Sequence, residues 1–261
     1  MNLHRAVYLA VALCACVSLA SCVRPSSPID PAPINLGQIL VNNEAAVNGH
    51  TDPANIRSME VDLAMKDGKS AFDAVYKVTR DGRMRIDIIQ GGKRVYTEAY
   101  DGHDGWDLGE DGTAAVTDRY AAALWHGTQF PGQIFSLRDV AAHGHEVKYI
   151  GRESIDSVNY HVVEITLSDG FKTYRYINPA TWMIERGRDF RAFHPAVDDK
   201  KTWIETVWSD YRPTDGVMRA YASVNTDLST GKWQATNTVT GFKLNPDLDP
   251  SVFIRPSAPA H

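Results

Sequence analysis

The thiol of Cys22 is the most reactive side chain that the sequence places in a distinctive setting. It closes the stretch "LASC" at residues 19–22. The other two cysteines, Cys14 and Cys16, lie in the same apolar run, so no cysteine follows position 22. A thiol reacts as a nucleophile through its thiolate, and this spacing is not that of a disulfide framework. Cysteine chemistry is therefore confined to the N-terminal segment.

Residues 1–21 have the layout of a secretory signal peptide. A short basic start precedes an apolar run from Ala6 to Ala20, and small residues stand before the cysteine. The run is shorter than the ~20 residues that cross a bilayer. The "LASC" stretch resembles a bacterial lipobox, whose cysteine takes a diacylglyceryl group on its sulfur and becomes the acylated N-terminus after cleavage. The resemblance implies that Cys22 is a lipid attachment site. The alternative is that Cys22 is a third incidental cysteine of a cysteine-containing signal peptide.

The residues after Cys22 bear on where the chain resides. In the sorting pattern that this motif resembles, an aspartate after the cysteine retains a lipoprotein at the inner membrane, whereas Val23 stands here. We therefore expect an outer-membrane anchor with the body facing the periplasm. The proline-rich segment 22–34 favours polyproline II geometry and spans roughly 30 Å at about 3.1 Å per residue. It would tether a single domain at 35–261.

His143 and His145 are the strongest metal candidates in the sequence. Residues two apart on a strand point to one side, and imidazole is a common zinc ligand. No third ligand stands nearby in the sequence. The alternative is two exposed loop histidines beside Gly144, and a metal-dependent hydrolase built on this pair is the last of our hypotheses for function.

Other polar clusters do not form a catalytic set. His103 and Asp104 are adjacent, but neighbours on a strand face opposite sides, and an Asp-Gly pair indicates a turn. The carboxylates of Asp107, Glu110 and Asp111 suggest a solvated loop. Because there is no nucleophile elbow, H-E-x-x-H motif or glycine-rich phosphate loop, we predict neither enzymatic activity nor a cofactor.

Charge and hydropathy limit the class of protein. The net charge is −5 with acidic and basic residues interspersed. Phosphate binding requires a concentrated basic face, so nucleic acid is not expected as a partner. The hydrophobic fraction of 43% suits a globular domain, and no second long apolar run suggests a transmembrane helix. The body is expected to be soluble.

Three helices are expected among the strands. Asn35, with a glutamine three residues later, matches a helix N-cap and its capping-box partner, so a helix is predicted from about 36 to 47. Asn43 interrupts its apolar stripe. The stretch "RYAAALWH" predicts a second helix that ends at Gly127, and a third is expected from about 134 to 142.

From Met59 onward, apolar and polar residues alternate with the period of half-buried strands, separated by Asp-Gly and Gly-Gly turns. Strands are expected at about 59–65, 72–78, 84–88, 95–99, 146–154, 159–168, 171–178, 182–188, 202–211, 217–226 and 232–242. Long strands in series twist and coil. We predict an α+β, mainly β fold in which a curved antiparallel sheet forms an incomplete, half β-barrel with helices covering its concave side.

This order of elements and several short stretches resemble the LolA and LolB family of periplasmic lipoprotein carriers and acceptors. The stretches that carry the resemblance are "RMRIDI", "YDGHDGW", "GRESIDSVNYHVVEITLSDG", "INPATWMIERG" and "LNPDLDPSVFIRP". The resemblance covers nearly the whole mature chain. It implies an open half-barrel whose apolar concave face binds acyl chains under a lid of helices.

A carrier needs a dry groove, because a fatty chain in water exposes apolar surface worth about 25 cal/mol per Å². The apolar faces of the predicted strands would supply it. The lipid-binding candidates are Val61, Leu63, Phe72, Tyr76, Met84, Ile86 and Trp106, with Leu124 and Trp125 on the lid. The alternative is that these residues form an ordinary core packed under a helix.

The resemblance implies an anchored lipoprotein that carries or accepts acyl chains of lipoproteins or lipids without chemical turnover, with a periplasmic carrier protein as its partner. An acceptor of this family has a protruding apolar loop, for which Phe130 is a candidate. A carrier has an arginine that holds its lid, for which Arg83 and Arg85 are both available. A non-carrier scaffold or envelope stress sensor with a filled core is the alternative function.

Overall fold

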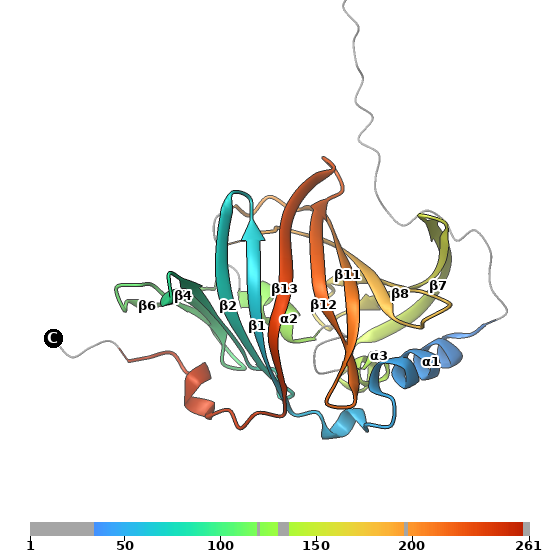
Figure 1. The fold of residues 1–261 in the computed structure, drawn as a ribbon, viewed down its shortest axis with the longest axis horizontal. Coiled ribbons are helices and arrows are strands. Elements are labelled where there is room, and N and C mark those ends of the chain that lie inside the picture. Colours follow the sequence, from blue (N-terminus) through green and yellow to red (C-terminus); the bar gives the residue numbers. More distant parts are fainter. Residues whose placement is uncertain (1–33, 119–120, 130–135, 196–197, 258–261) are drawn as a thin grey trace, which may run out of the picture.

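A single antiparallel β-sheet dominates the protein. The computed structural model describes residues 34–257, except for 119–120, 130–135 and 196–197. The expected signal peptide, lipidation site and apolar loop residue, Cys22 and Phe130 among them, lie outside the described residues. The described strands form one sheet of 13 strands that does not close on itself (Figure 1). The fold is mainly β, as the alternating sequence pattern predicts.

The strands follow the ranges that the alternation predicts, with two additions. They are β1 (Ser58–Asp67), β2 (Ser70–Thr79), β3 (Met84–Gln90), β4 (Lys93–Tyr100), β5 (Gly105–Leu108), β6 (Ala114–Val116), β7 (Glu146–Ile155), β8 (Val158–Thr166), β9 (Lys172–Ile177), β10 (Ile184–Arg191), β11 (Thr202–Thr214), β12 (Val217–Asp227) and β13 (Lys232–Leu244). The order across the sheet is β6-β5-β4-β3-β2-β1-β13-β12-β11-β10-β9-β8-β7. Two meanders are therefore joined where β1 pairs with β13.

Three α-helices and two 3-10 helices accompany the sheet in the described part of the chain. They are α1 (Leu36–Asn48), η1 (Pro53–Asn55), α2 (Ala121–Gln129), α3 (Leu137–Ala142) and η2 (Pro250–Phe253). The predicted N-cap is confirmed, since the Asn35 side chain accepts a hydrogen bond from the backbone N–H of Gln38 at 2.9 Å. No described helix has the length and apolar character needed to cross a membrane.

One face of the sheet, called here the inner face, carries the helices. Residues that pair across neighbouring strands share a face of the sheet. From β8 to β11 the successive partners on the inner face are Val163, Arg175, Gly187 and Thr206. The register carries this same face on through β12 and β13 to Met65 on β1. The opposite side is called the outer face.

Two separate apolar clusters hold the helices on the inner face. Near one end of the sheet, α1 and α3 pack against β8 to β10, with Ile39, Leu137 and Val163 all buried. Near the middle, Leu124 of α2 packs against a cluster that includes Met84 of β3. Burying one such side chain contributes about 1.5–3 kcal/mol, so helix placement follows from these contacts more than from helix propensity.

Asn43 explains how α1 tolerates a polar residue on its buried stripe. Its side chain is 2% exposed, and its amide donates a hydrogen bond of 2.7 Å to the backbone carbonyl of Trp182. A buried amide that keeps its hydrogen bond avoids the cost of an unsatisfied polar group. The interruption in the sequence pattern is therefore a fixed contact between α1 and the turn before β10.

One expectation about local structure is wrong, and another holds only in part. Helix α2 does not end at Gly127 but continues to Gln129, because this glycine packs beside Met84 instead of adopting a left-handed cap. Of the three carboxylates expected in a solvated loop, Asp107 lies instead in β5, which pairs with β4 and β6, whereas Glu110 and Asp111 are exposed in the turn between β5 and β6. These two strands have only 4 and 3 residues, too few for a period of two to be recognised.

Gly187 provides a test of inner-face packing. A Cβ at this position would lie 2.5 Å from Nη1 of Arg175 and 2.8 Å from Cη2 of Trp208. We expect Gly187→Ala to lower the free energy of unfolding by about 1–3 kcal/mol, since neither group can move without disturbing the other. Equilibrium denaturant unfolding measures this change.

Gly127→Ala is the matched control for that variant. Its Cβ would meet only Met84 Sδ, at 3.4 Å, and alanine favours a helix interior over glycine by about 0.5–1 kcal/mol. Gly127→Ala should therefore be neutral or stabilising. Equal loss of stability in both variants would contradict the packing described for Gly187.

Candidate functional site

A cavity of about 580 Å³ lies between the inner face and the helices. Its wall combines residues of α1, α2 and α3 with residues of β4 and β9 to β12 and of the segment after β10. The lining residues are Asn43, Val47, Tyr96, Glu98, Ala123, Leu124, His126, Gly127, Ser136, Leu137, Phe171, Arg175, Ile184, Asp189, Arg191, Ala192, Phe193, His194, Pro195, Thr206, Trp208, Tyr211, Met218, Arg219 and Ala220. Segments far apart in the sequence thus enclose one space.

Apolar side chains form much of this wall, and each is fixed by the packing behind it. Leu124 and Leu137 are 6% and 1% exposed and belong to the two different apolar clusters of the inner face. Trp208 packs against the cluster of α1 and α3 from the side of β11. The cavity therefore occupies the space that the two clusters leave between them.

Several predicted lipid-binding residues come together on the inner face. Tyr76, Ile86 and Met84 pack in one cluster with Leu124, and Val61 lies opposite Tyr76 in the register. Of the nine candidates, Leu124 is the one that lines the cavity. The other three of this cluster form the packed floor beneath α2.

The remaining inner-face candidates lie outside that cluster. Leu63 pairs with Ala74 and Phe72 pairs with Met65, and both Leu63 and Phe72 are half-buried. Trp125 is half-buried as well and packs against the cluster of α1 and α3. None of these three lines the cavity.

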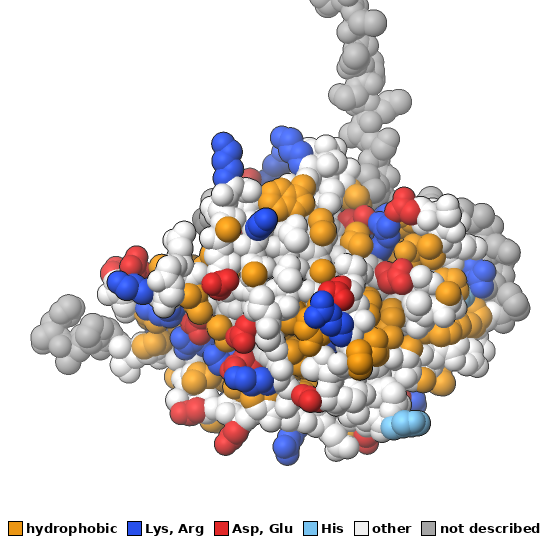
Figure 2. All heavy atoms as spheres, viewed as in Figure 1, with side chains coloured by type: hydrophobic (Ala, Val, Ile, Leu, Met, Phe, Trp, Pro, Cys, Tyr) orange, Lys and Arg blue, Asp and Glu red, His pale blue; other side chains and the backbone are white. Residues whose placement is uncertain are grey.

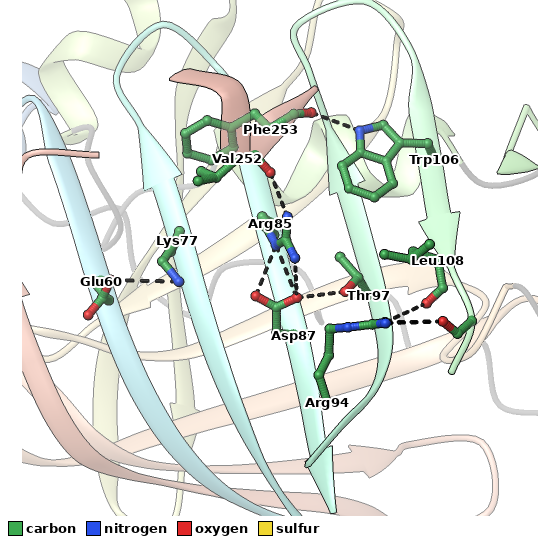
Figure 3. A network of polar contacts seen from close by, with 11 residues as sticks. Glu60, Lys77, Arg85, Asp87, Arg94, Thr97, Trp106, Leu108, Val252 and Phe253 are labelled. Carbon is green, nitrogen blue, oxygen red and sulfur yellow. Dashed lines mark hydrogen bonds and ion pairs between the residues drawn. The ribbon is translucent and has the colours of Figure 1, made fainter. Parts of the chain in front are cut away.

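Trp106 lies on the outer face, away from the cavity. Trp106 pairs with Ala99 of β4. The neighbouring Glu98 pairs with Ile86 on the inner face, so Ala99 and Trp106 face the opposite side. Its indole Nε1 donates a hydrogen bond of 2.8 Å to the carbonyl of Phe253 in η2 (Figure 3). The side chain is 1% exposed because η2 covers it. The expectation placed it among inner-face residues because β5 was not recognised as a strand.

Among the described residues, neither of the two arginines proposed for a lid is bonded to a helix over the cavity. Arg85 lies on the outer face, where its guanidinium binds Asp87 at 2.8 Å and the carbonyl of Val252 (Figure 3). Arg83 binds Asp81 at 2.6 Å. Arg80, in the turn between β2 and β3, does bind a helix: its Nη2 lies 2.9 Å from Oδ2 of Asp139 in α3.

The outer face of β1, β13 and β12 carries a mixed surface. Figure 2 shows acidic, basic and apolar side chains interspersed over these strands, without a single-sign patch on this side. Pairs such as Lys243 with Glu60 contribute to this pattern. This face offers no concentrated basic surface for phosphate.

The histidine pair does not converge on a metal site. His145 accepts a hydrogen bond at Nδ1 from the backbone N–H of Ser168, so its Nε2 carries the proton that reaches Gln129. Nδ1 of His143 lies instead 2.7 Å from the carbonyl oxygen of Asp139. Within the described ranges, no three His, Cys, Asp or Glu side chains are grouped as metal ligands would be.

Charged groups line the cavity beside the apolar ones, and sequence reasoning missed them. Arg175 is 1% exposed and stacks over Trp208, with Cζ 5.4 Å from the ring centroid and Nη1 3.5 Å from Oδ1 of Asp189. Arg219 is 6% exposed. It stands two residues from Val217 and from Tyr221, so a charge inside an apolar alternation was the available signal.

Glu98 is a titratable group of the cavity wall with a strongly raised pKa. Burial raises its pKa to about 7, and the negative charge of Asp107 opposite it on β5 acts in the same direction. The folded protein therefore binds this proton more tightly than the unfolded chain does. Near neutral pH the carboxyl is divided between its neutral and charged forms.

Comparisons with solved structures identify the fold. This chain superimposes on a LolA superfamily protein from Nitrosomonas europaea with a TM-score of 0.56 and 14% identity, covering 85% of this chain and 98% of that one. For an outer membrane lipoprotein-sorting protein domain from Vibrio parahaemolyticus the values are 0.54, 12%, 83% and 94%. For a DUF1329 family protein from Desulfovibrio piger they are 0.53, 12%, 83% and 95%.

The protein thus has a LolA-like fold, and the resemblance read from its sequence is confirmed at the level of structure. No protein-family model matches the sequence, and neither does any curated protein. At these identities the similarity defines a fold and not an activity.

The pKa of Glu98 predicts a pH dependence of stability. Its folded value, about 7, lies above its ordinary value of 4.5, so its stabilising contribution is complete below pH 4.5 and is lost as the pH rises to about 7. We expect Glu98→Gln to remove this loss, which has a limiting slope of about 1.4 kcal/mol per pH unit. Denaturant unfolding of both proteins between pH 4.5 and 8 measures it.

Glu110→Gln is the control, because Glu110 is an exposed carboxylate in the turn between β5 and β6. It should leave the wild-type pH profile in place. A wild-type profile that Glu98→Gln does not alter would contradict a buried, protonated Glu98.

Proposed function

We propose that this protein is an outer-membrane lipoprotein whose periplasmic body is an incomplete barrel that binds acyl chains of lipoproteins or lipids. It would act as a carrier or acceptor in lipoprotein sorting or envelope lipid trafficking, without chemical turnover. The observation that carries the proposal is the cavity between the inner face and the helices. Cys22, outside the described residues, would hold the body at the membrane.

The size and lining of the cavity support an acyl chain as the occupant. Its volume of about 580 Å³ falls within the roughly 300–1,000 Å³ typical of ligand sites. Each methylene moved from water into such a space gains about 0.8 kcal/mol. Leu124, Leu137, Trp208 and Met218 supply apolar surface from four different elements.

The wall also suggests how a chain would enter. Ala123 is exposed and yet lines the cavity, so it lies at the edge where the cavity meets solvent. Access along α2 would not require the sheet to open. The LolA-like fold supports the proposed function, because the proteins that share it include an outer membrane lipoprotein-sorting domain.

Transfer in this proposal depends on relative affinity alone. An acceptor that binds the chain about 1.4 kcal/mol more tightly than its donor shifts the distribution tenfold. A periplasmic carrier would be the donor, and the anchored body would be the acceptor. An anchor at Cys22 fits this order, because it confines the acceptor to the membrane that receives the cargo.

Blocking the cavity edge tests the proposal. We expect Ala123→Trp to weaken binding of a fluorescent fatty-acid analogue by at least about tenfold, since the indole would occupy the entrance. Fluorescence titration of the full chain carrying Cys22→Ser measures this affinity. Ala122→Trp is the matched control, because Ala122 is exposed on the same helix and does not line the cavity.

Equal binding by the two tryptophan variants would count against this cavity as the site. No binding by any variant or by the parent chain would favour the scaffold or stress-sensor alternative.

The anchor is tested separately. We expect Cys22→Ser to move the protein from the membrane fraction to the soluble periplasmic fraction, because the thioether to the lipid requires the sulfur. Cys16→Ser, inside the predicted signal peptide, should leave the protein on the membrane. Fractionation followed by intact mass measurement distinguishes the two, and an unmodified mass for wild-type Cys22 would exclude lipidation.

A further inference from the structure

Arg219 of β12 is a buried cation in the cavity wall. Its side chain is 6% exposed and lines the same space as Trp208 and Leu124. Its Nε is buried without a hydrogen-bond partner. No hydrogen bond, ion pair or ring contact joins Arg219 to any residue in the described part of the chain.

The other basic side chains of the cavity wall each lie beside a carboxylate. Arg175 and Arg191 approach the carboxylate of Asp189 at 3.5 and 3.7 Å. His126 lies 2.7 Å from Asp169, and His194 lies 2.8 Å from Asp67. Arg219 thus differs from every other basic residue that lines the cavity, each of which has a carboxylate within ion-pair distance.

Neither carboxylate of the cavity wall forms an ion pair with Arg219. Asp189 already serves two arginines, and Glu98 lies on β4, which β3, β2, β1 and β13 separate from β12. Burial lowers the pKa of Arg219 to about 10, with Tyr211 acting in the opposite direction. The guanidinium therefore stays charged at neutral pH, and a buried charge without a counter-charge destabilises the folded state.

We propose that Arg219 binds the anionic head of an acidic amphiphile whose apolar tail occupies the cavity. This inference rests on the proposed function for the tail and adds the class of ligand. Carboxylates and phosphates both match the planar fork of a guanidinium, which can donate two parallel hydrogen bonds. A free fatty acid and a lipid phosphate share this chemistry, whereas an amide-linked acyl chain lacks it.

The test compares ligands that differ only in the head. Palmitate, hexadecyl phosphate and uncharged methyl palmitate are titrated into the full chain carrying Cys22→Ser at pH 7.5, with calorimetric detection. We expect at least one anion to bind between about tenfold and a hundredfold more tightly than the ester, the range of a hydrogen bond to a charged group. The tighter anion identifies the head.

Substitutions then assign the effect to one residue. Arg219→Met should lower the affinity for the anion to that for the ester without weakening the ester, and Arg219→Lys should retain part of the preference. Arg212→Met is the matched control, because Arg212 faces Arg219 across β11 and β12 but is exposed and paired with Asp210. It should keep the full preference.

The outcomes separate this inference from the proposed function. Equal affinity of the wild-type chain for the ester and both anions overturns the role of Arg219 and leaves acyl-chain binding in place. Binding of none of the three ligands overturns the proposed function itself. An anion preference that survives in Arg219→Met also overturns the inference. If Arg219→Met does not fold, Arg219→Lys and the wild-type comparison decide.

Discussion

The structure depends on one constraint: the inner face of a wide sheet must be covered, and few helical residues are present to cover it. The described helices have 13, 9 and 6 residues, against a sheet of 13 strands. They bury apolar side chains in two clusters, one under α1 and α3 and one under α2. The space between these clusters is the cavity, so the hollow follows from how the helices are distributed.

Charged groups keep this space from being an ordinary apolar pocket. The stack of Arg175 on Trp208 needs Gly187 behind it, because any side chain there would displace both. Asp189 compensates two of the guanidinium groups. The cost of burying a charge in a low-dielectric wall is thus offset for Arg175 and Arg191 but not for Arg219. The side of the cavity at Arg219 is therefore where we expect a negatively charged group of a ligand to bind.

Much of the fold was predictable from the sequence, because apolar alternation gives strand positions directly. The meander and the cap of α1 at Asn35 follow from local patterns, and the LolA-like arrangement was implied by the resemblance to that family. Strands β5 and β6 were not predictable, since they are too short for a period to be seen. Trp106 was therefore assigned to the wrong face: its side is set by pairing with Ala99, which only the register reveals.

The candidate site was predicted less well than the fold. The sequence pattern ranked apolar residues of β1 to β3, of which Tyr76, Met84 and Ile86 belong to a packed cluster. The cavity is lined instead by Arg175, Trp208 and Arg219 from β9, β11 and β12. A hollow is a property of packing between distant segments, so no single stretch encodes it. The one local signal was an arginine at position 219 within an apolar alternation.

The central claim is that the cavity is held open for a guest. Native mass spectrometry of the Cys22→Ser chain isolated from the bacterial envelope tests it most directly. We expect a complex whose added mass is that of an acyl-chain lipid, released intact when the protein is activated in the gas phase. A protein that carries no lipid, and that takes none up when exposed to envelope lipids, would contradict it.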